Sequence, residues 1–183
     1  DHHMGIIQPD GTEVDCWSAS YGGGTSFSAN ICTTSSMSGT GIESPSATSG
    51  AALLGGVVRA NEVNNGVVPH ALFLVASCTS GHIYPGTSDA NNCGGLPIGA
   101  WIHLNMSHAQ IAASGCGNTA ILNALADYGA FILDTGGVGN SMALSLESPQ
   151  YYASNGNSPP SYPGGTAINW PCISSSVNVL QHP

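Results

Sequence analysis

Six cysteines are the feature that most constrains how this chain of 183 residues can fold. They are Cys16, Cys32, Cys78, Cys93, Cys116 and Cys172. Six thiols can pair in many ways, and none of the spacings matches a zinc ribbon or a redox CxxC motif. We favour Cys16–Cys32 and Cys78–Cys93, because each pair would close a segment rich in Gly, Ser and Asn. Cys116–Cys172 would then tie the C-terminal part to the body.

Disulfides persist in oxidising compartments, so this pattern predicts a secreted, extracellular protein. The alternative is six reduced cysteines in the core of a cytosolic protein. The length predicts a single domain over residues 1–183. Because the first residue is Asp1, we expect a processed or trimmed N-terminus.

Cationic side chains are nearly absent. Arg59 is the only Lys or Arg, and the net charge is −9 with histidine neutral. Charged residues make up 6% of the chain, against about a quarter in most globular proteins. Binding to nucleic acid or to anionic membranes needs clustered cations, so both classes of partner are excluded. The apolar fraction of 42% also excludes a disordered chain.

Short apolar segments separated by turn residues predict a mainly β fold. A hairpin is expected over residues 4–17, around the turn Pro9-Asp10-Gly11. Residues 18–50 are rich in Ser, Gly and Thr and predict long crossed loops. A helix is expected from Asn118 or Thr119 to Gly129. Further strands are predicted at 70–77, 100–104, 130–133 and 142–146. Together these elements favour a jelly-roll-like β-sandwich with one or two short helices.

Three segments together resemble a group of secreted microbial proteins. Residues 1–4 read DHHM, residues 54–72 contain LGGVVR and VPHAL, and residues 125–136 contain LADYG and DTG. The group carries "DRH", "GLVR…E…G…HAL" and "AL..YG….D.G" segments and occurs in polysaccharide-degrading and cell-wall contexts. The resemblance implies a secreted β-sandwich connected with carbohydrate, without a mechanism. Two positions differ, because His2 replaces the arginine of "DRH" and Asp15 stands where glutamate is expected.

Scarce carboxylates are the first candidates for catalysis. Glycoside hydrolysis normally uses two carboxyl groups on either side of the scissile bond. Glu13 and Asp15 alternate along one strand and face the same side, while Asp134 follows a buried strand. Our hypothesis is that Asp15 and Asp134 converge on one cleft as acid and base, assisted by His70. The alternative is that Glu13 and Asp15 face solvent and Asp134 orders its own turn.

Three histidines lie beside apolar strands, namely His3, His70 and His103. His70 opens the most apolar strand and could act as a general base. His3, His103 and Glu13 are assigned to substrate binding. No cofactor is assigned, although three imidazoles with Asp15 would also suit zinc or copper. The further alternative for His70 is a core histidine satisfied by a backbone carbonyl.

Aromatic residues complete the functional prediction. Tyr151 and Tyr152 lie in a stretch of Ser, Asn, Gly and Pro and are expected to stack on sugar rings, whereas the three tryptophans are expected to pack in the core. A serine hydrolase is disfavoured because no G-x-S-x-G elbow occurs. We therefore expect a secreted protein that cleaves a polysaccharide, as a glycoside hydrolase or lyase. The alternative is a non-catalytic carbohydrate-binding or self-assembling surface module.

Overall fold

The computed structural model describes residues 2–23, 26–42, 47–136, 142–148, 158, 161–162 and 165–180. Within these ranges the chain consists mainly of strands arranged in sheets, with a few short helices and three disulfides. The disulfides join the predicted pairs Cys16–Cys32, Cys78–Cys93 and Cys116–Cys172. No helix in this part of the chain is both long and apolar enough to cross a bilayer.

The N-terminal sheet contains the predicted hairpin. Its strands β1 (Met4–Ile7), β2 (Thr12–Trp17) and β5 (Ile31–Ser36) pair antiparallel in the order β1-β2-β5. In the turn between β1 and β2, the Gly11 N–H donates to the Gln8 carbonyl and the Thr12 N–H donates to the Asp10 carboxylate. Gly11 has a φ of 83°, a conformation that glycine adopts without strain.

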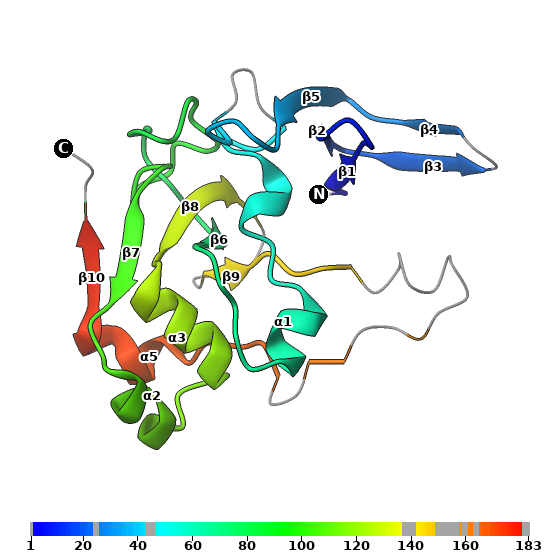
Figure 1. Cartoon of the computed structure of the whole chain (residues 1–183). Coiled ribbons are helices and arrows are strands. Elements are labelled where there is room, and N and C mark those ends of the chain that lie inside the picture. The colour runs from blue at the N-terminus through cyan, green and yellow to red at the C-terminus, as the bar shows by residue number, and fades with distance from the viewer. Residues whose placement is uncertain are drawn as a thin grey trace.

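A two-stranded arm extends from this sheet (Figure 1). Its strands are β3 (Ser20–Gly23) and β4 (Ser26–Ser28), and they follow the course of β2 and β5 away from the body. The prediction of loops throughout residues 18–50 is therefore wrong for β3, β4 and β5. Their Ser, Thr and Gly residues show no apolar alternation, so the strands arise from cross-strand pairing and not from a local pattern.

The central sheet has five strands in the order β10-β7-β8-β6-β9. Strands β6 and β8 pair parallel and the other neighbours pair antiparallel. The predictions at 70–77, 100–104 and 130–133 are confirmed, whereas the one at 142–146 holds only for Ala143 and Leu144. The bounds are β6 Leu72–Ala76, β7 Trp101–Leu104, β8 Ala130–Thr135, β9 Ala143–Leu144 and β10 Val177–Leu180.

The helices are short. Asn118 caps α3 through its side chain, which accepts from the Ala120 and Ile121 N–H groups, and the helix ends just before Gly129, as predicted. Helix α2 was not predicted, although its capping box of Ser107 and Gln110 is visible in the sequence. The bounds are α1 Ala60–Asn64, α2 His108–Ser114, α3 Thr119–Asp127 and α5 Trp170–Ile173, with 3₁₀ turns η1 Leu53–Gly55 and η2 Ser174–Ser176.

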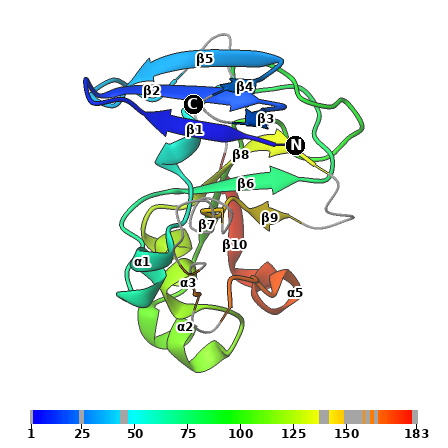
Figure 2. The ribbon, with the colours of Figure 1, turned by 90° about the vertical axis from the view of Figure 1, so that its right-hand side faces the viewer.

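The elements form three layers (Figure 2). One face of the central sheet packs on the helices, where Leu74 of β6 and Leu125 of α3 belong to one buried cluster. Phe73 points to the other face and packs against Leu53 of η1 beneath the N-terminal sheet. The jelly-roll-like β-sandwich is not confirmed. Parallel neighbours such as β6 and β8 need a long crossover, and here it carries β7, α2 and α3.

Candidate functional site

Two of the predicted site residues hold the backbone of η1. The Asp15 carboxylate accepts from the Leu53 N–H and the Glu13 carboxylate accepts from the Leu54 N–H, each at 2.7 Å. Asp15 is fully buried and Glu13 is 5% exposed, so the expectation that they might face solvent is wrong. Gly5 lies opposite Asp15 on β1, and a Cβ there would come within 2.6 Å of the Leu54 side chain. The N-terminal sheet is thus fitted closely onto η1.

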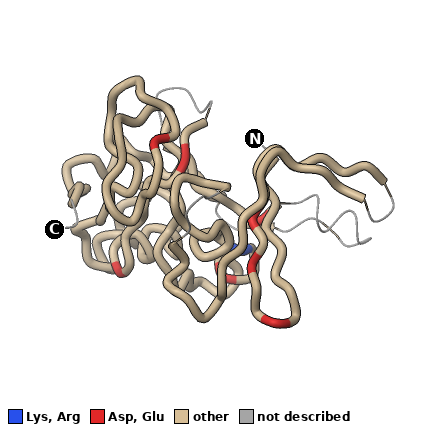
Figure 3. The backbone as a smooth tube through the Cα atoms, turned by 90° about the horizontal axis from the view of Figure 1, so that it is seen from above, with Lys and Arg blue, Asp and Glu red and all other residues tan. Residues whose placement is uncertain are grey.

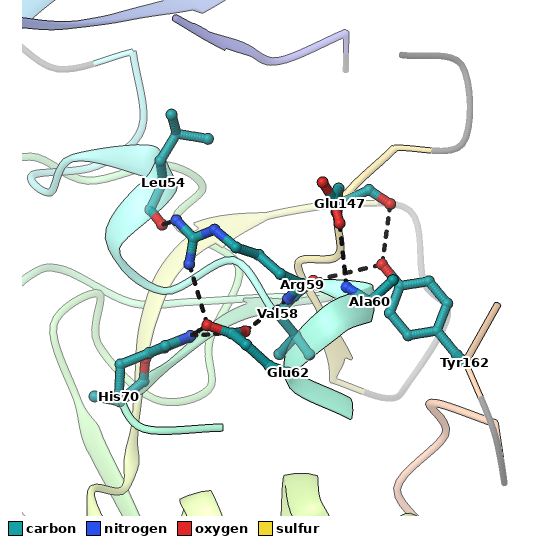
Figure 4. Close-up of polar contacts among 9 residues, drawn as sticks. Leu54, Val58, Arg59, Ala60, Glu62, His70, Glu147 and Tyr162 are labelled. Atoms are coloured by element: carbon teal, nitrogen blue, oxygen red, sulfur yellow. Dashed lines mark hydrogen bonds and ion pairs between the residues drawn. The ribbon is translucent and has the colours of Figure 1, made fainter. Parts of the chain in front are cut away.

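The same turn leads to the only arginine (Figure 4). Arg59 Nη2 donates to the Leu54 carbonyl at 2.9 Å, and Nη1 lies 3.4 Å from Oε1 of Glu62 on α1. The Glu62 side chain is 14% exposed, and both of its oxygens lie 3.2 Å from Nε2 of His70. Polar contacts therefore run without a break from Glu13 through Leu54, Arg59 and Glu62 to His70.

His70 has acceptors at both ring nitrogens. Nε2 faces the Glu62 carboxylate, and Nδ1 lies 2.8 Å from the carbonyl of Ala71. A neutral imidazole has only one N–H, so the doubly protonated ring is the form that donates to both. Both ring nitrogens of His70 therefore face oxygen atoms of the protein itself. The backbone-carbonyl contact expected for a structural histidine is present.

The start of α1 adds two more carboxylate contacts. The Arg59 N–H donates to Glu62 Oε2 at 2.8 Å, and the Ala60 N–H donates to Glu147 Oε2 at 3.1 Å. The Tyr162 hydroxyl donates to the Glu147 carbonyl at 3.2 Å. Burial raises the pKa of Tyr162, and the negative charges of Glu147 and Glu62 act in the same direction. Glu62 and Glu147 were not predicted as site residues. Glu62 is the glutamate of the segment that resembles "GLVR…E…G…HAL", whereas no sequence signal marked Glu147.

A second pair joins the N-terminal segment to the central sheet. Nε2 of His3 lies 3.1 Å from Oδ2 of Asp134, and their side chains are 19% and 17% exposed. Oδ1 of Asp134 also accepts from the Thr135 N–H at 2.7 Å, as expected for an acid that orders its own turn. A register shift in the β6–β8 pairing precedes Asp134, and bulges of this kind redirect side chains.

The three predicted catalytic residues therefore have different partners. Asp15 binds η1, His70 binds Glu62, and Asp134 binds His3. His103 lies on β7, with its ring 5.8 Å from that of Trp101. Tyr151 and Tyr152 lie outside the described residues. Among the side chains that are described, no group of three or more His, Cys, Asp or Glu could hold a metal ion, so the three-imidazole site is not formed there.

Two neighbouring cavities lie away from these groups. Their volumes are about 650 Å³ and about 350 Å³. Both are lined by Met142, Ile168 and Trp170, and none of the described residues in either wall is a histidine, aspartate or glutamate. The described ionisable side chains and these two cavities therefore lie in different parts of the molecule.

Exposed aromatic residues gather on the arm. Tyr21 is 75% exposed and Phe27 is 48% exposed, and the two lie directly opposite each other on β3 and β4. Trp17, expected in the core, is 41% exposed at the base of the arm. No Asp, Glu, Lys or Arg occurs in residues 16–42, and Figure 3 shows the arm free of charged positions along its described length. The arm is an uncharged surface with an aromatic pair.

Comparison with known proteins gives no match among family models, curated proteins or solved structures. The resemblance to secreted microbial proteins therefore stays a prediction.

Proposed function

We propose that the chain is a non-catalytic extracellular module that binds neutral polysaccharide through the β3–β4 arm. The observation that carries this proposal is the cross-strand pair Tyr21 and Phe27. Directly opposite residues project from the same face of a hairpin, so the two rings form one platform. Aromatic faces offer sugar C–H groups a large apolar contact, and a tyrosine carries a polar group at one end of its ring.

Charge supports a neutral glycan over an acidic one. The net charge is −9, and the only arginine already contacts Leu54 and Glu62. A polymer of uronic acids or sulfated sugars would be repelled by this surface field. The arm itself adds no charge, so a neutral polymer can approach without displacing counterions.

The base of the arm is held firmly. Cys16 and Cys32 are opposite residues of β2 and β5, and their disulfide closes the hairpin below the aromatic pair. The Asn30 N–H donates to the Trp17 carbonyl at 3.1 Å, and the Ala19 N–H donates to the His2 carbonyl. An anchored platform loses less conformational entropy on binding than a free loop does. The three disulfides also favour an extracellular location.

The carboxylates support binding over cleavage. Glu13 and Asp15 accept hydrogen bonds from the η1 backbone, and Glu62 lies between Arg59 and His70. A general acid or base needs access to the scissile bond. None of these groups lines either of the two cavities.

One observation favours a second candidate, the cleavage of polysaccharide. His3 and Asp134 form a partly exposed pair, in which the carboxylate could orient the imidazole. If this pair cleaves polysaccharide, Asp134→Asn abolishes the release of reducing ends from the polymer. Release at the wild-type rate by Asp134→Asn would reject Asp134 as a catalytic residue.

The binding proposal is tested by affinity electrophoresis and by pull-down on insoluble neutral glycans, with a uronic-acid polymer as the charged comparison. We expect retardation on one or more neutral glycans, at least a tenfold loss in Tyr21→Ala and in Phe27→Ala, and unchanged retardation in Tyr128→Ala. Tyr128 is 45% exposed but lies at the end of α3, which makes it a matched control. Equal retardation of all four proteins, or none by any neutral glycan, would overturn the proposal.

A further inference from the structure

Strand β10 is an open edge of the central sheet (Figure 1). It pairs with β7 on one side, and no described strand lies on its other side. Asn178, Val179 and Leu180 are all exposed, Val179 at 44% and Leu180 at 43%. Two apolar side chains are therefore exposed at the same edge whose backbone groups face no other described strand.

The register with β7 shows which backbone groups point outward. The Asn105 N–H donates to the Ser176 carbonyl at 2.7 Å, so Ser176 and Asn105 form a hydrogen-bonded pair. Hydrogen-bonded and non-hydrogen-bonded residue pairs alternate along two antiparallel strands. Asn178 is therefore bonded to β7, whereas the backbone groups of Val177 and Val179 point away from it. The Val177 N–H donates to the Ser174 carbonyl, which leaves the Val177 C=O and both groups of Val179 facing outward.

The usual protection of an edge strand is missing from β10. Natural proteins prevent edge strands from pairing with other chains by means of lysine, proline, β-bulges or very short strands. The opposite edge of the same sheet, β9, is only two residues long. By contrast, β10 has the sequence VNVL, and its four residues pair with β7 without a register shift.

Symmetry makes a second copy of this chain the partner that fits this edge. In a two-fold antiparallel pairing, outward-facing residues must lie opposite each other. The register centred on Asn178 meets this condition, because Val177 then faces Val179 of the second copy and Asn178 faces its own equivalent. Apolar side chains meet apolar ones, and two amides that can bond to each other meet at the axis.

The distribution of charge also favours a second copy of this chain as the partner at this edge. Two molecules of net charge −9 repel each other wherever their acidic surfaces meet. No Asp, Glu, Lys or Arg occurs in residues 148–183, so the segment that contains β10 brings no like charges together. An approach through this edge keeps the carboxylates of the N-terminal sheet away from the contact.

We propose that β10 is the seam of a two-fold dimer in which the central sheets of two copies join edge to edge. The seam contains two backbone hydrogen bonds, from the Val179 N–H of each copy to the Val177 carbonyl of the other. Because only residues 177–179 of each β10 lie opposite one another in this register, association is weak and depends on protein concentration. The inference concerns a surface separate from the β3–β4 arm and stands without the proposed function.

The test is sedimentation velocity of the full chain over rising protein concentration, in enough salt to screen the net charge. We expect the molar mass to rise toward twice the monomer value. Val179→Pro removes the outward N–H without taking a hydrogen bond from β7, so it should stay monomeric. Val67→Lys is the control, because Val67 is 60% exposed outside the strands. It should associate like the wild type.

A charge exchange at the axis tests the register. Asn178→Asp and Asn178→Lys each place like charges opposite each other and should stay monomeric alone. An equimolar mixture should restore the dimer, because the charges are then opposite. A merely misfolded variant would not be rescued by mixing. A wild-type chain that stays monomeric at every concentration, a Val179→Pro chain that associates normally, or a mixture that does not recover would each overturn the proposal.

Discussion

The N-terminal sheet and the central sheet are held by different forces. The central sheet buries a continuous apolar cluster against α2 and α3, with Leu74, Ile102 and Leu125 fully buried. The N-terminal sheet instead directs two carboxylates, Glu13 and Asp15, at the backbone of η1 and carries a disulfide between neighbouring strands. Apolar burial thus stabilises one sheet, whereas hydrogen bonds and a covalent link stabilise the other.

This difference explains how a chain with so few charges uses them. A buried carboxylate that accepts from backbone N–H groups forms strong charge-assisted bonds. Acids at such positions fix the relative placement of two layers, and this is a structural role. Scarcity of acids therefore does not by itself mark the remaining ones as catalytic.

The largest expected effect lies in the central sheet. Leu125→Ala should lower the free energy of unfolding by about 2–5 kcal/mol, because it leaves a cavity in the main cluster. Chemical denaturation monitored by circular dichroism measures this loss. Val67→Ala, at a side chain that is 60% exposed, should change stability by less than about 0.5 kcal/mol. Equal effects of the two substitutions would contradict the assignment of the core.

Removing the disulfide of the N-terminal sheet comes next. Cys16→Ala with Cys32→Ala should lower stability by about 3 kcal/mol, because the unfolded chain regains the freedom of a loop whose ends are 16 residues apart. Hydrogen exchange read residue by residue should speed up in β2 to β5, while the amides of α3 keep their protection. Uniform loss of protection throughout both sheets would show that the two regions are not separate in stability.

A smaller effect is expected from the buried carboxylate. Asp15→Ala should lower stability by about 1–3 kcal/mol, since it leaves the Leu53 N–H buried without this acceptor. Asp15→Asn keeps an oxygen acceptor and should lose less. The Leu53 amide should exchange faster in Asp15→Ala than in the wild type. Unchanged exchange at Leu53 would mean that the carboxylate does not hold η1.

The smallest effect belongs to the turn between β1 and β2. The Thr12 N–H donates to Asp10 and lowers the pKa of this exposed carboxyl below its ordinary value of 3.8. Its contribution to stability is therefore present above pH 3.8 and is lost as the pH falls through the lower folded-state pKa. Nuclear magnetic resonance of the Thr12 amide should follow this titration. A midpoint at or above 3.8 would contradict the hydrogen bond.

Local signals in the sequence predicted much of the central sheet. The apolar run before Cys78 is β6, and Asn118 and Gly129 mark the two ends of α3 as the capping rules require. The disulfides followed from which loops each pair would close. The strand and the helix ends depend on residues that are close together in sequence. The disulfides involve only six cysteines, which limits how they can pair.

The partners of the acids could not be predicted in the same way. Asp15 binds a backbone group 38 residues away, and His3 binds a carboxylate 131 residues away. Each contact depends on how the layers stack, and no local pattern carries that information. The two strands of the arm were missed because Ser, Thr and Gly give no apolar period.

Arg59 has a practical consequence for experiments on this protein. Proteases that cut after lysine or arginine have one site in the chain. In the native structure that residue, Arg59, is the N-cap of α1, and its backbone N–H donates to Glu62. No disulfide joins residues 1–59 to residues 60–183. One cut therefore leaves two fragments with no covalent link between them, which separate under denaturing conditions without a reducing agent. The rate of that single cleavage reports how often the contacts between η1, α1 and His70 open.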